Sequence, residues 1–393
     1  MDSAGKSGEM TATGSAPVSV RPQYLRTAGV PAVVIALGVF AAVRLAGAVV
    51  LAGAALWAGR SPVRVLGHSW DSVWYLAIAR HGYGRTQMWP VTGLVQSDYA
   101  FFPLYPLLVR LTGGGEWGAL FVSWTAAAVA AVGVYRVGEL VAGRRVGVLL
   151  VALWSVVPHA VVLTLAYTEP LLVALAAWSL YALLRERWTV AALLASVAGL
   201  TRPTGIAVAA AVSVTALHAL LTRRSRGAAV WAAGVLAPAG WLAYVAAVGV
   251  HRRDPAGYFD VQRQWGSRFD GGGYVLNQVW RVLSGGPVAL ATAVTAALLG
   301  AALLLAVLLL VRRPALPLPL LVYTAVLLVI GIGGAGYFES KPRFLLPAFP
   351  LLLPLAAVMA RARPRSAVVV TAGLAGLSYA YGVYLLVIAK MPL

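Results

Sequence analysis

The chain has 393 residues, of which 61% are hydrophobic and 11% charged, and its formal net charge is +19. A soluble domain is about half apolar and about a quarter charged, so this composition excludes an ordinary soluble protein and indicates a membrane protein. The absence of cysteine excludes disulfides, thiolate metal sites and a cysteine nucleophile.

Residues 1–27 are polar and rich in small residues. We expect a disordered cytoplasmic tail there, followed by a single transmembrane domain over residues 28–393. A spanning helix needs about 20 mostly apolar residues, and about eleven stretches qualify. They lie near residues 30–57, 117–141, 147–166, 170–184, 188–201, 204–222, 228–250, 287–311, 317–336, 344–360 and 367–389. The expected fold class is an all-α polytopic membrane protein with about eleven transmembrane helices.

Arginine clusters between these stretches predict the orientation of the chain. The clusters are Arg144-Arg145, Arg185 and Arg187, Arg223-Arg224-Arg226, Arg312-Arg313 and Arg361-Arg363-Arg365. Short basic loops mark the cytoplasmic side, and a cytoplasmic N-terminus places every one of these clusters there. We therefore attribute the positive charge to topology and expect no nucleic-acid partner, because such a partner needs a contiguous basic surface.

Two long connections, residues 58–116 and 251–286, then lie outside the cytosol. Long loops without spans of their own tend to be functional. Most acidic residues fall on the same side: Asp71, Asp98, Glu116, Glu169, Asp254, Asp260, Asp270 and Glu339. Acids are few in this chain and gather there, so we expect a cell-membrane protein whose active-site face is extracytoplasmic and formed by these two loops.

The stretch "SWDSVWYLAIARHGYG" at residues 69–84 predicts a helix along the membrane surface. An apolar stripe at helical spacing runs through Trp70, Val73, Trp74 and Ala77. Asp71 and Tyr75 share another face. Ser69 is the expected N-cap, which puts Asp71 in the first turn, where the helix dipole favours a negative charge by about 0.3–1 kcal/mol. That structural role is compatible with catalysis, because a helix start that keeps Asp71 ionised also prepares a general base.

Downstream, "YAFFPLYPLLVRL" at residues 99–111 is an aromatic, proline-stiffened return into the membrane. Together "WDSVWYLAIARHGY" and "AFFPLYPLL" resemble the PIG-V family of mannosyltransferases, in the glycosyltransferase C superfamily. "AYTEPLL" (166–172) is similar to that family's Tyr-Ser-Glu element, and "SVVPHAVVL" (155–163) to its Ser-x-x-Pro segment, with Pro158 one residue late. "GLTRPTGI" (199–206) matches the Arg-Ser-Asn-Gly element only through Arg202 and Gly205.

The resemblance implies a glycosyltransferase C-type helix bundle with surface helices in the first outer loop. It also implies an inverting enzyme that moves mannose from a polyprenyl-phosphate mannose donor to an extracytoplasmic glycolipid or glycan, with Asp71 as general base. This role expects an unpaired Asp71 beside an opening. The main alternative is a lipid or sugar transporter or flippase that transfers no sugar; transporters place their site at mid-membrane between repeats, and we find no internal repeat.

Cationic side chains are needed at the departing lipid phosphate. The candidates are Arg202, Lys341 and Arg343, of which Arg202 rests on the family match. We expect the sugar or acceptor to contact Tyr75, His81, Tyr83, Asp98, Phe101, Phe102 and Glu169. Four of these residues also have an ordinary interpretation. Arg202 can snorkel to the headgroups, and Lys341 and Arg343 can bind anionic lipid headgroups. Glu169 can stabilise a helix start.

Asp98 is the best second carboxylate, and a separation of about 5 Å from Asp71 would favour a retaining, double-displacement route instead. The few histidines and scattered acids show no metal-ligand spacing, so we expect neither a metal nor another cofactor. The expected partners are the polyprenyl-phosphate sugar donor, the acceptor and membrane lipids, and we expect a monomer.

Overall fold

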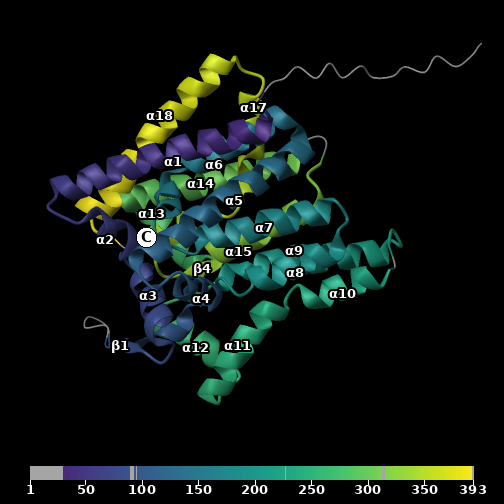
Figure 1. The fold of residues 1–393 in the computed structure, drawn as a ribbon, viewed down its shortest axis with the longest axis horizontal. Coiled ribbons are helices and arrows are strands. Elements are labelled where there is room, and N and C mark those ends of the chain that lie inside the picture. Colours follow the sequence, from purple (N-terminus) through teal and green to yellow (C-terminus); the bar gives the residue numbers. More distant parts are fainter. Residues whose placement is uncertain (1–29, 89–92, 94, 226, 312–314, 392–393) are drawn as a thin grey trace, which may run out of the picture. The chain divides into compact units, whose positions relative to one another are not determined.

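Helices make up nearly all the regular structure of the computed structural model, which describes residues 30–88, 93, 95–225, 227–311 and 315–391. The expected tail over residues 1–27 lies outside these ranges, as do Arg226, Arg312 and Arg313. Residues Ala32–Leu393 cluster as one unit (Figure 1).

Within the described residues, six helical segments are long and apolar enough to cross a bilayer. They are α1 (Ala32–Trp57), α5 (Glu116–Ala142), η3 with α9 (Pro203–Leu221), α10 with α11 (Ala228–Arg252), α14 (Leu290–Val311) and α18 with η6 (Pro364–Ile388). The shorter helices of the bundle are α6 (Arg144–Val156), α7 (Glu169–Leu184), α8 (Trp188–Ala198) and α15 (Leu318–Gly333). The all-α polytopic class is confirmed, whereas the count of eleven spans is not.

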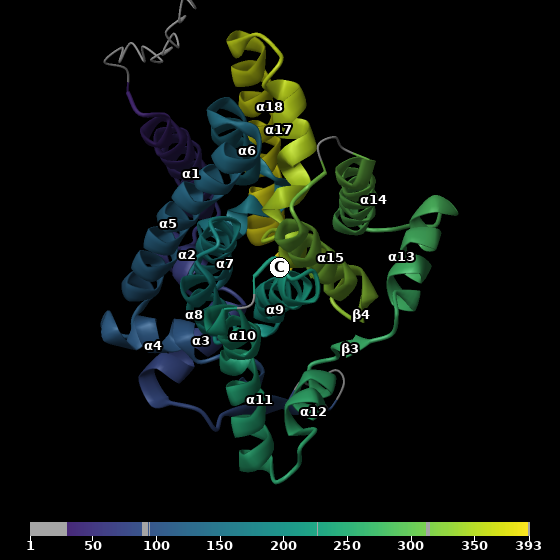
Figure 2. The same ribbon diagram turned by 90° about the vertical axis from the view of Figure 1, so that its right-hand side faces the viewer.

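Neighbouring helices run back and forth through the bundle. Helix α5 packs on α6 and α7, α7 packs on α8, and α9 packs on α10 and α15. Figure 1 shows α5, α7 and α9 side by side, and in Figure 2 α7 and α9 are seen nearly end-on while α5 is seen obliquely. This alternation brings every second connection to the same end of the bundle.

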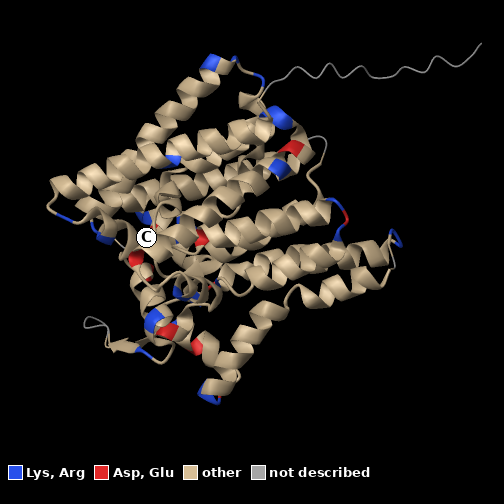
Figure 3. Cartoon of the chain, viewed as in Figure 1, with Lys and Arg blue, Asp and Glu red and all other residues tan. Residues whose placement is uncertain are grey.

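At one end of the bundle, contacts between turns join in pairs the four arginine clusters that lie at least partly within the described residues. Arg145 donates a hydrogen bond of 2.5 Å to the carbonyl of Ala362, which joins the α5–α6 turn to the turn between α17 (Leu353–Met359) and α18 (Pro364–Val383). Glu186 and Arg224 form an ion pair of 2.8 Å, which joins the α7–α8 and α9–α10 turns. Most charged residues lie at helix ends and in loops (Figure 3). That this end is cytoplasmic stays a prediction.

At the opposite end several spans are interrupted beside prolines. Helix α6 gives way to η2 (Pro158–Leu163), and α8 and α9 are joined through η3 (Pro203–Gly205). The segments Phe338–Leu345 and Phe349–Met359, which contain η4 (Phe338–Ser340), α16 (Lys341–Leu345), η5 (Phe349–Leu352) and α17 (Leu353–Met359), bend by 80°. Proline removes a backbone donor and breaks the helix, so these breaks supply free backbone and polar side chains inside the bundle.

Short elements cover this end. They are α2 (Pro62–Gly67), α3 (Asp71–His81), β1 (Thr86–Met88), β2 (Val95–Ser97), η1 (Asp98–Ala100), α4 (Leu104–Leu111), α12 (Gly257–Gln264), β3 (Arg268–Phe269), α13 (Gly273–Leu283) and β4 (Gly334–Ala335). The antiparallel pair β1–β2 aligns Thr86 with Ser97. The pair β3–β4 aligns Arg268 with Ala335 and so joins the connection over residues 251–286 to the bent span.

The helix predicted within residues 69–84 is present as α3. Its buried side chains are Ser72, Tyr75, Leu76, Ile78 and Ala79. The apolar stripe expected at the membrane interface is the more exposed side, with Val73 at 41% exposure. Buried Ser72 and Tyr75 therefore serve packing, and the stripe is left for the surrounding medium.

Close helix contact in the second half of the bundle requires glycine at position 240. A Cβ on Gly240, at the start of α11, would overlap the carbonyl oxygen of Ser196 on α8. The Gly240 amide also donates to the Ser196 hydroxyl at 3.0 Å. Small residues let helix backbones approach in this way.

We predict that Gly240→Ala lowers the free energy of unfolding by about 1–3 kcal/mol, because the overlap involves backbone that cannot move aside. Gly234→Ala is the matched control, since its Cβ would lie 3.6 Å from that of Ala216 and alanine favours the helix by about 1 kcal/mol. Thermal unfolding in detergent, followed by tryptophan fluorescence, should separate the two. Equal midpoints would contradict the packing at Gly240.

Candidate active site

Asp71 is the first residue of α3, as the sequence predicts, but Ser69 does not cap the helix. The Ser69 hydroxyl donates instead to the carbonyl of Val65 at 2.7 Å, and Trp70 occupies the N-cap with φ 53°. A bulky residue at positive φ is strained, and such strain clusters at functional sites. The backbone is therefore held in an unfavourable conformation directly before Asp71.

The segment Tyr167-Thr168-Glu169 approaches Asp71 from the other side of the site. Ser123 on α5 fixes this segment, because its hydroxyl donates to the Tyr167 carbonyl at 2.9 Å and accepts from the Tyr167 amide at 3.1 Å. The Tyr75 hydroxyl lies 3.3 Å from that of Thr168. Helix α7 then begins at Glu169, with Pro170 in its first turn.

Two arginines reach the same place from different interruptions. Arg202 is the extended residue just before η3, and Arg343 lies in α16 of the bent span. Both side chains are only 7% exposed. A buried guanidinium needs a counter-charge, and here the counter-charges are Asp71 and Glu169.

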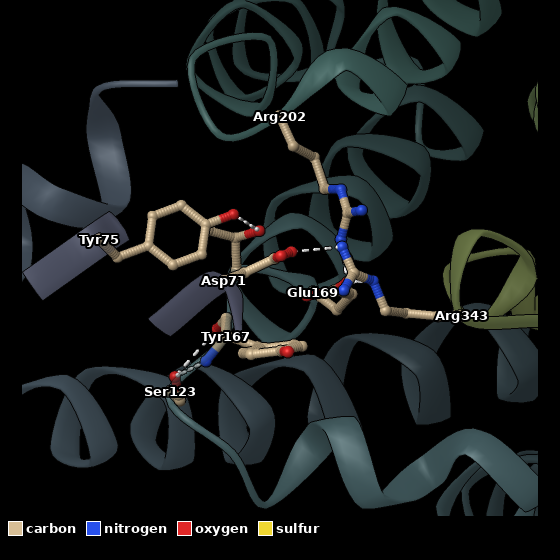
Figure 4. Close-up of polar contacts among 8 residues, drawn as sticks. Asp71, Tyr75, Ser123, Tyr167, Glu169, Arg202 and Arg343 are labelled. Atoms are coloured by element: carbon tan, nitrogen blue, oxygen red, sulfur yellow. Dashed lines mark hydrogen bonds and ion pairs between the residues drawn. The ribbon is translucent and has the colours of Figure 1, made fainter. Parts of the chain in front are cut away.

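These four side chains form one charge cluster (Figure 4). Arg343 contacts Asp71 Oδ2 through Nη2 at 2.5 Å and Glu169 Oε1 through Nε at 2.7 Å. Arg202 Nη1 forms an ion pair with the same Glu169 oxygen. Two carboxylates and two guanidinium groups balance in charge, and Arg343 is shared between both carboxylates.

Exposure within the charge cluster is uneven. The Glu169 side chain is 1% exposed, whereas that of Asp71 is 23% exposed. A ligand can therefore reach the cluster from the Asp71 side, with Glu169 at its base. Arg202 Nε is buried and makes no hydrogen bond to the described residues, which leaves a donor for an acceptor group.

The expectation of an unpaired Asp71 is wrong. Its Oδ2 atom accepts from Arg343, a residue 272 positions away in the chain. A cavity of about 320 Å³ lies instead beside Tyr99, His251 and Arg252. Asp71 is thus a partly exposed carboxylate whose charge is already compensated.

All three predicted phosphate-binding cations surround one aromatic ring, that of Phe344. The guanidinium carbons of Arg202 and Arg343 lie 5.7 and 5.4 Å from its centroid, and Lys341 Nζ lies 5.9 Å away. Cations are stabilised over the face of an aromatic ring. Lys341 Nζ also donates to the Gly334 carbonyl. Sequence analysis missed Phe344, although its position within "KPRFLLPAFP" was a usable signal.

The predicted sugar-binding aromatics near Asp71 are buried. Tyr75 packs edge-on against Phe101 at 5.1 Å, and Phe101 stacks on Trp74 at 5.8 Å. Phe102 is 1% exposed and packs on Tyr244. Burial, and then the charge of Asp71, raise the pKa of Tyr75 well above its usual range, so it is a neutral hydroxyl. Tyr75 and Phe101 support the α3 side of the site, and Phe102 lies deeper.

His81, Tyr83 and Asp98 are not brought to Asp71. His81 ends α3 and is exposed, about 15 Å from Asp71 along the helix. The fully buried Asp98 carboxylate accepts from the amides of Gly84 and Arg85 at 3.0 and 2.9 Å. The prediction that Asp98 contacts a sugar is corrected to a structural role, and Glu169, not Asp98, is the carboxylate next to Asp71.

The cavity at the far end of α3 has an aromatic border that sequence analysis missed. Tyr99 stacks on Tyr83 at 5.3 Å, and its hydroxyl lies 3.0 Å from His251 Nε2. Arg252 completes the wall. Over the ranges that the structure describes, no three His, Asp or Glu side chains converge on a possible metal position.

Comparisons with known proteins bear on the fold. Residues 101–248, less than half of the chain, match the family model described as dolichyl-phosphate-mannose-protein mannosyltransferase. No curated protein matches the chain. Among solved structures the chain is similar to ArnT from Cupriavidus metallidurans bound to undecaprenyl phosphate, with 18% identity and a TM-score of 0.51. The match covers 83% of this chain and 60% of that one. The chain therefore has the glycosyltransferase C-type membrane fold, whereas PIG-V membership specifically is not confirmed.

We predict that Glu169→Gln lowers the free energy of unfolding by about 3–5 kcal/mol, because it leaves two buried guanidinium groups with one carboxylate fewer. Glu186→Gln is the matched control: Glu186 also pairs with an arginine, but the Glu186 and Arg224 side chains are 61% and 75% exposed. We expect less than about 1 kcal/mol there. Thermal unfolding in detergent measures both, and a small effect at Glu169 would contradict its structural role.

Proposed function

We propose that this protein is an inverting membrane glycosyltransferase that takes a sugar from a polyprenyl-phosphate donor and attaches it to an acceptor hydroxyl. We further propose that the sugar is mannose and the acceptor an extracytoplasmic glycolipid or glycan. The match of residues 101–248 to a dolichyl-phosphate-mannose-dependent family model supports the sugar. The likeness to an undecaprenyl-phosphate-bound structure supports the kind of lipid.

One observation carries the proposal: a partly exposed carboxylate and two buried guanidinium groups meet at a point where four separate segments converge. Glycosyl transfer from a lipid phosphate needs a base at the acceptor and cations at the leaving group. Asp71 and the arginines 202 and 343 offer both within one cluster. The interrupted helices beside them provide irregular backbone of the kind that lines cavities at membrane depth.

The proposed reaction has one displacement step. Asp71 takes the proton from the acceptor hydroxyl, and that oxygen attacks the anomeric carbon of the donor sugar. The bond between the anomeric carbon and the phosphate oxygen breaks, and its electron pair stays on the polyprenyl phosphate. Arg202 and Arg343, with Lys341 behind them, stabilise this added charge. The product keeps one new glycosidic bond of inverted configuration.

The geometry favours this enzyme over a flippase because the charge cluster lies among helix ends and interruptions on the side of the bundle away from the basic turns. A transporter is expected to hold its site near the membrane midplane. The two classes differ in whether the sugar–phosphate bond is broken. A transferase breaks it, whereas a flippase moves the donor across the bilayer and leaves it intact.

We predict that Asp71→Asn slows mannose transfer by about 10²–10⁴-fold, the usual contribution of a general base. The assay follows radiolabelled mannose leaving polyprenyl-phosphate mannose in the presence of membrane-extracted acceptors.

Glu139→Gln is the control, because Glu139 contacts Arg136 and Arg144 at 3.0 and 3.4 Å but lies at the other end of the bundle. It should transfer at the normal rate. Full activity of Asp71→Asn would remove Asp71 as the base, and intact donor appearing across proteoliposomes without cleavage would favour the flippase.

A further inference from the structure

We propose that Arg343 is shared between Asp71 and the donor phosphate, so that Asp71 becomes an available base only after the donor has bound. This inference rests on the proposed function and specifies how its site is controlled. It starts from the ion pair of 2.5 Å that occupies Asp71 Oδ2. An acceptor hydroxyl and the Arg343 guanidinium compete for the same carboxylate.

Arg343 uses different nitrogens for its two carboxylates. Nε faces Glu169 at 2.7 Å, and Nη2 faces Asp71 at 2.5 Å. Glu169 can therefore anchor the guanidinium through Nε while a new anion replaces Asp71 at Nη2. Arg202 also contacts Glu169, so Glu169 stays compensated throughout. Glu169 is a positioning residue in this scheme, and the exchange involves only the contact with Asp71.

A phosphate is a suitable competitor for Nη2. Guanidinium–phosphate contacts are charge-assisted and fit the fork of arginine nitrogens. Asp71 is the most exposed member of the charge cluster, with 23% of its side chain accessible, so the phosphate can approach Arg343 Nη2 from the Asp71 side.

The exchange of Arg343 from Asp71 to the phosphate also agrees with the change in charge of both groups during the reaction. As the bond to the sugar breaks, the phosphate gains negative charge and attracts Arg343 more strongly. Asp71 simultaneously gains a proton and no longer needs the cation. Arg343, which is already at the phosphate, therefore interacts with the leaving group more strongly in the transition state than in the ground state. The donor binds first and the acceptor second.

Binding of undecaprenyl monophosphate in detergent micelles tests this without any sugar transfer. We expect Asp71→Asn to bind this lipid about five- to tenfold more tightly than the wild type, because the competitor for Arg343 is gone. Undecaprenol, which has the same tail and no phosphate, should show no such gain. Glu116→Gln removes an acid that pairs with Arg80 and His68 on the same side, and its affinity should not change.

A double-mutant cycle separates competition for Arg343 from simple charge repulsion. In an Arg343→Gln background, Asp71→Asn should change the affinity less than twofold. If Arg343→Gln does not fold, Arg343→Lys replaces it: one ammonium cannot span both carboxylates as the fork does, so the gain should shrink. Equal or weaker binding by Asp71→Asn, or a full gain without Arg343, would overturn the proposal.

The outcomes also separate this inference from the proposed function. A gain in phosphate affinity that depends on Arg343, in a protein that never cleaves the donor, would keep the shared guanidinium and remove the transferase. Active transfer with no gain in Asp71→Asn would keep the transferase and remove the exchange.

Discussion

The buried ion pairs of Glu169 are the interaction on which the rest of the site depends. This carboxylate is 1% exposed and contacts Arg202 and Arg343, which come from two different helix interruptions. Isolated charges are costly inside a membrane protein, so neither arginine could lie there without it. Through Arg343 the same network reaches Asp71, and a surface helix is thereby tied to the interior of the bundle.

Interrupted helices explain why polar groups can gather inside so apolar a chain. Pro158, Pro203 and Pro347 lie where helices are interrupted, because a continuous helix does not tolerate proline in its interior. Each break turns a short stretch of chain back into the bundle, where its polar residues meet those of other breaks. Strain accompanies this construction, because Trp70 and Tyr337 both have positive φ on either side of the site. The active end is thus built from helix ends, and the opposite end from ordinary basic turns.

Sequence reasoning identified the features that depend on local composition. The apolar stretches, the helix beginning at Asp71 and the three cations of the site were all recognisable. The pairing of Asp71 with Arg343 was not, because it depends on packing between residues 272 positions apart. The buried face of α3 has a similar cause: periodicity located its apolar stripe but could not show which side chains of the helix pack against the bundle. Phe344 was missed although it directly follows the basic pair in "KPRFLLPAFP", because its contact with Arg202 depends on packing between distant segments.

The small β3–β4 pairing has a mechanical consequence. It fastens Arg268 to Ala335, and nearby the Tyr337 hydroxyl donates to the carbonyl of Trp265 at 2.5 Å. The segment around residues 265–269 and the bent span that carries Arg343 are consequently held together by hydrogen bonds. A displacement of this segment would therefore also displace Arg343, the residue that pairs with Asp71.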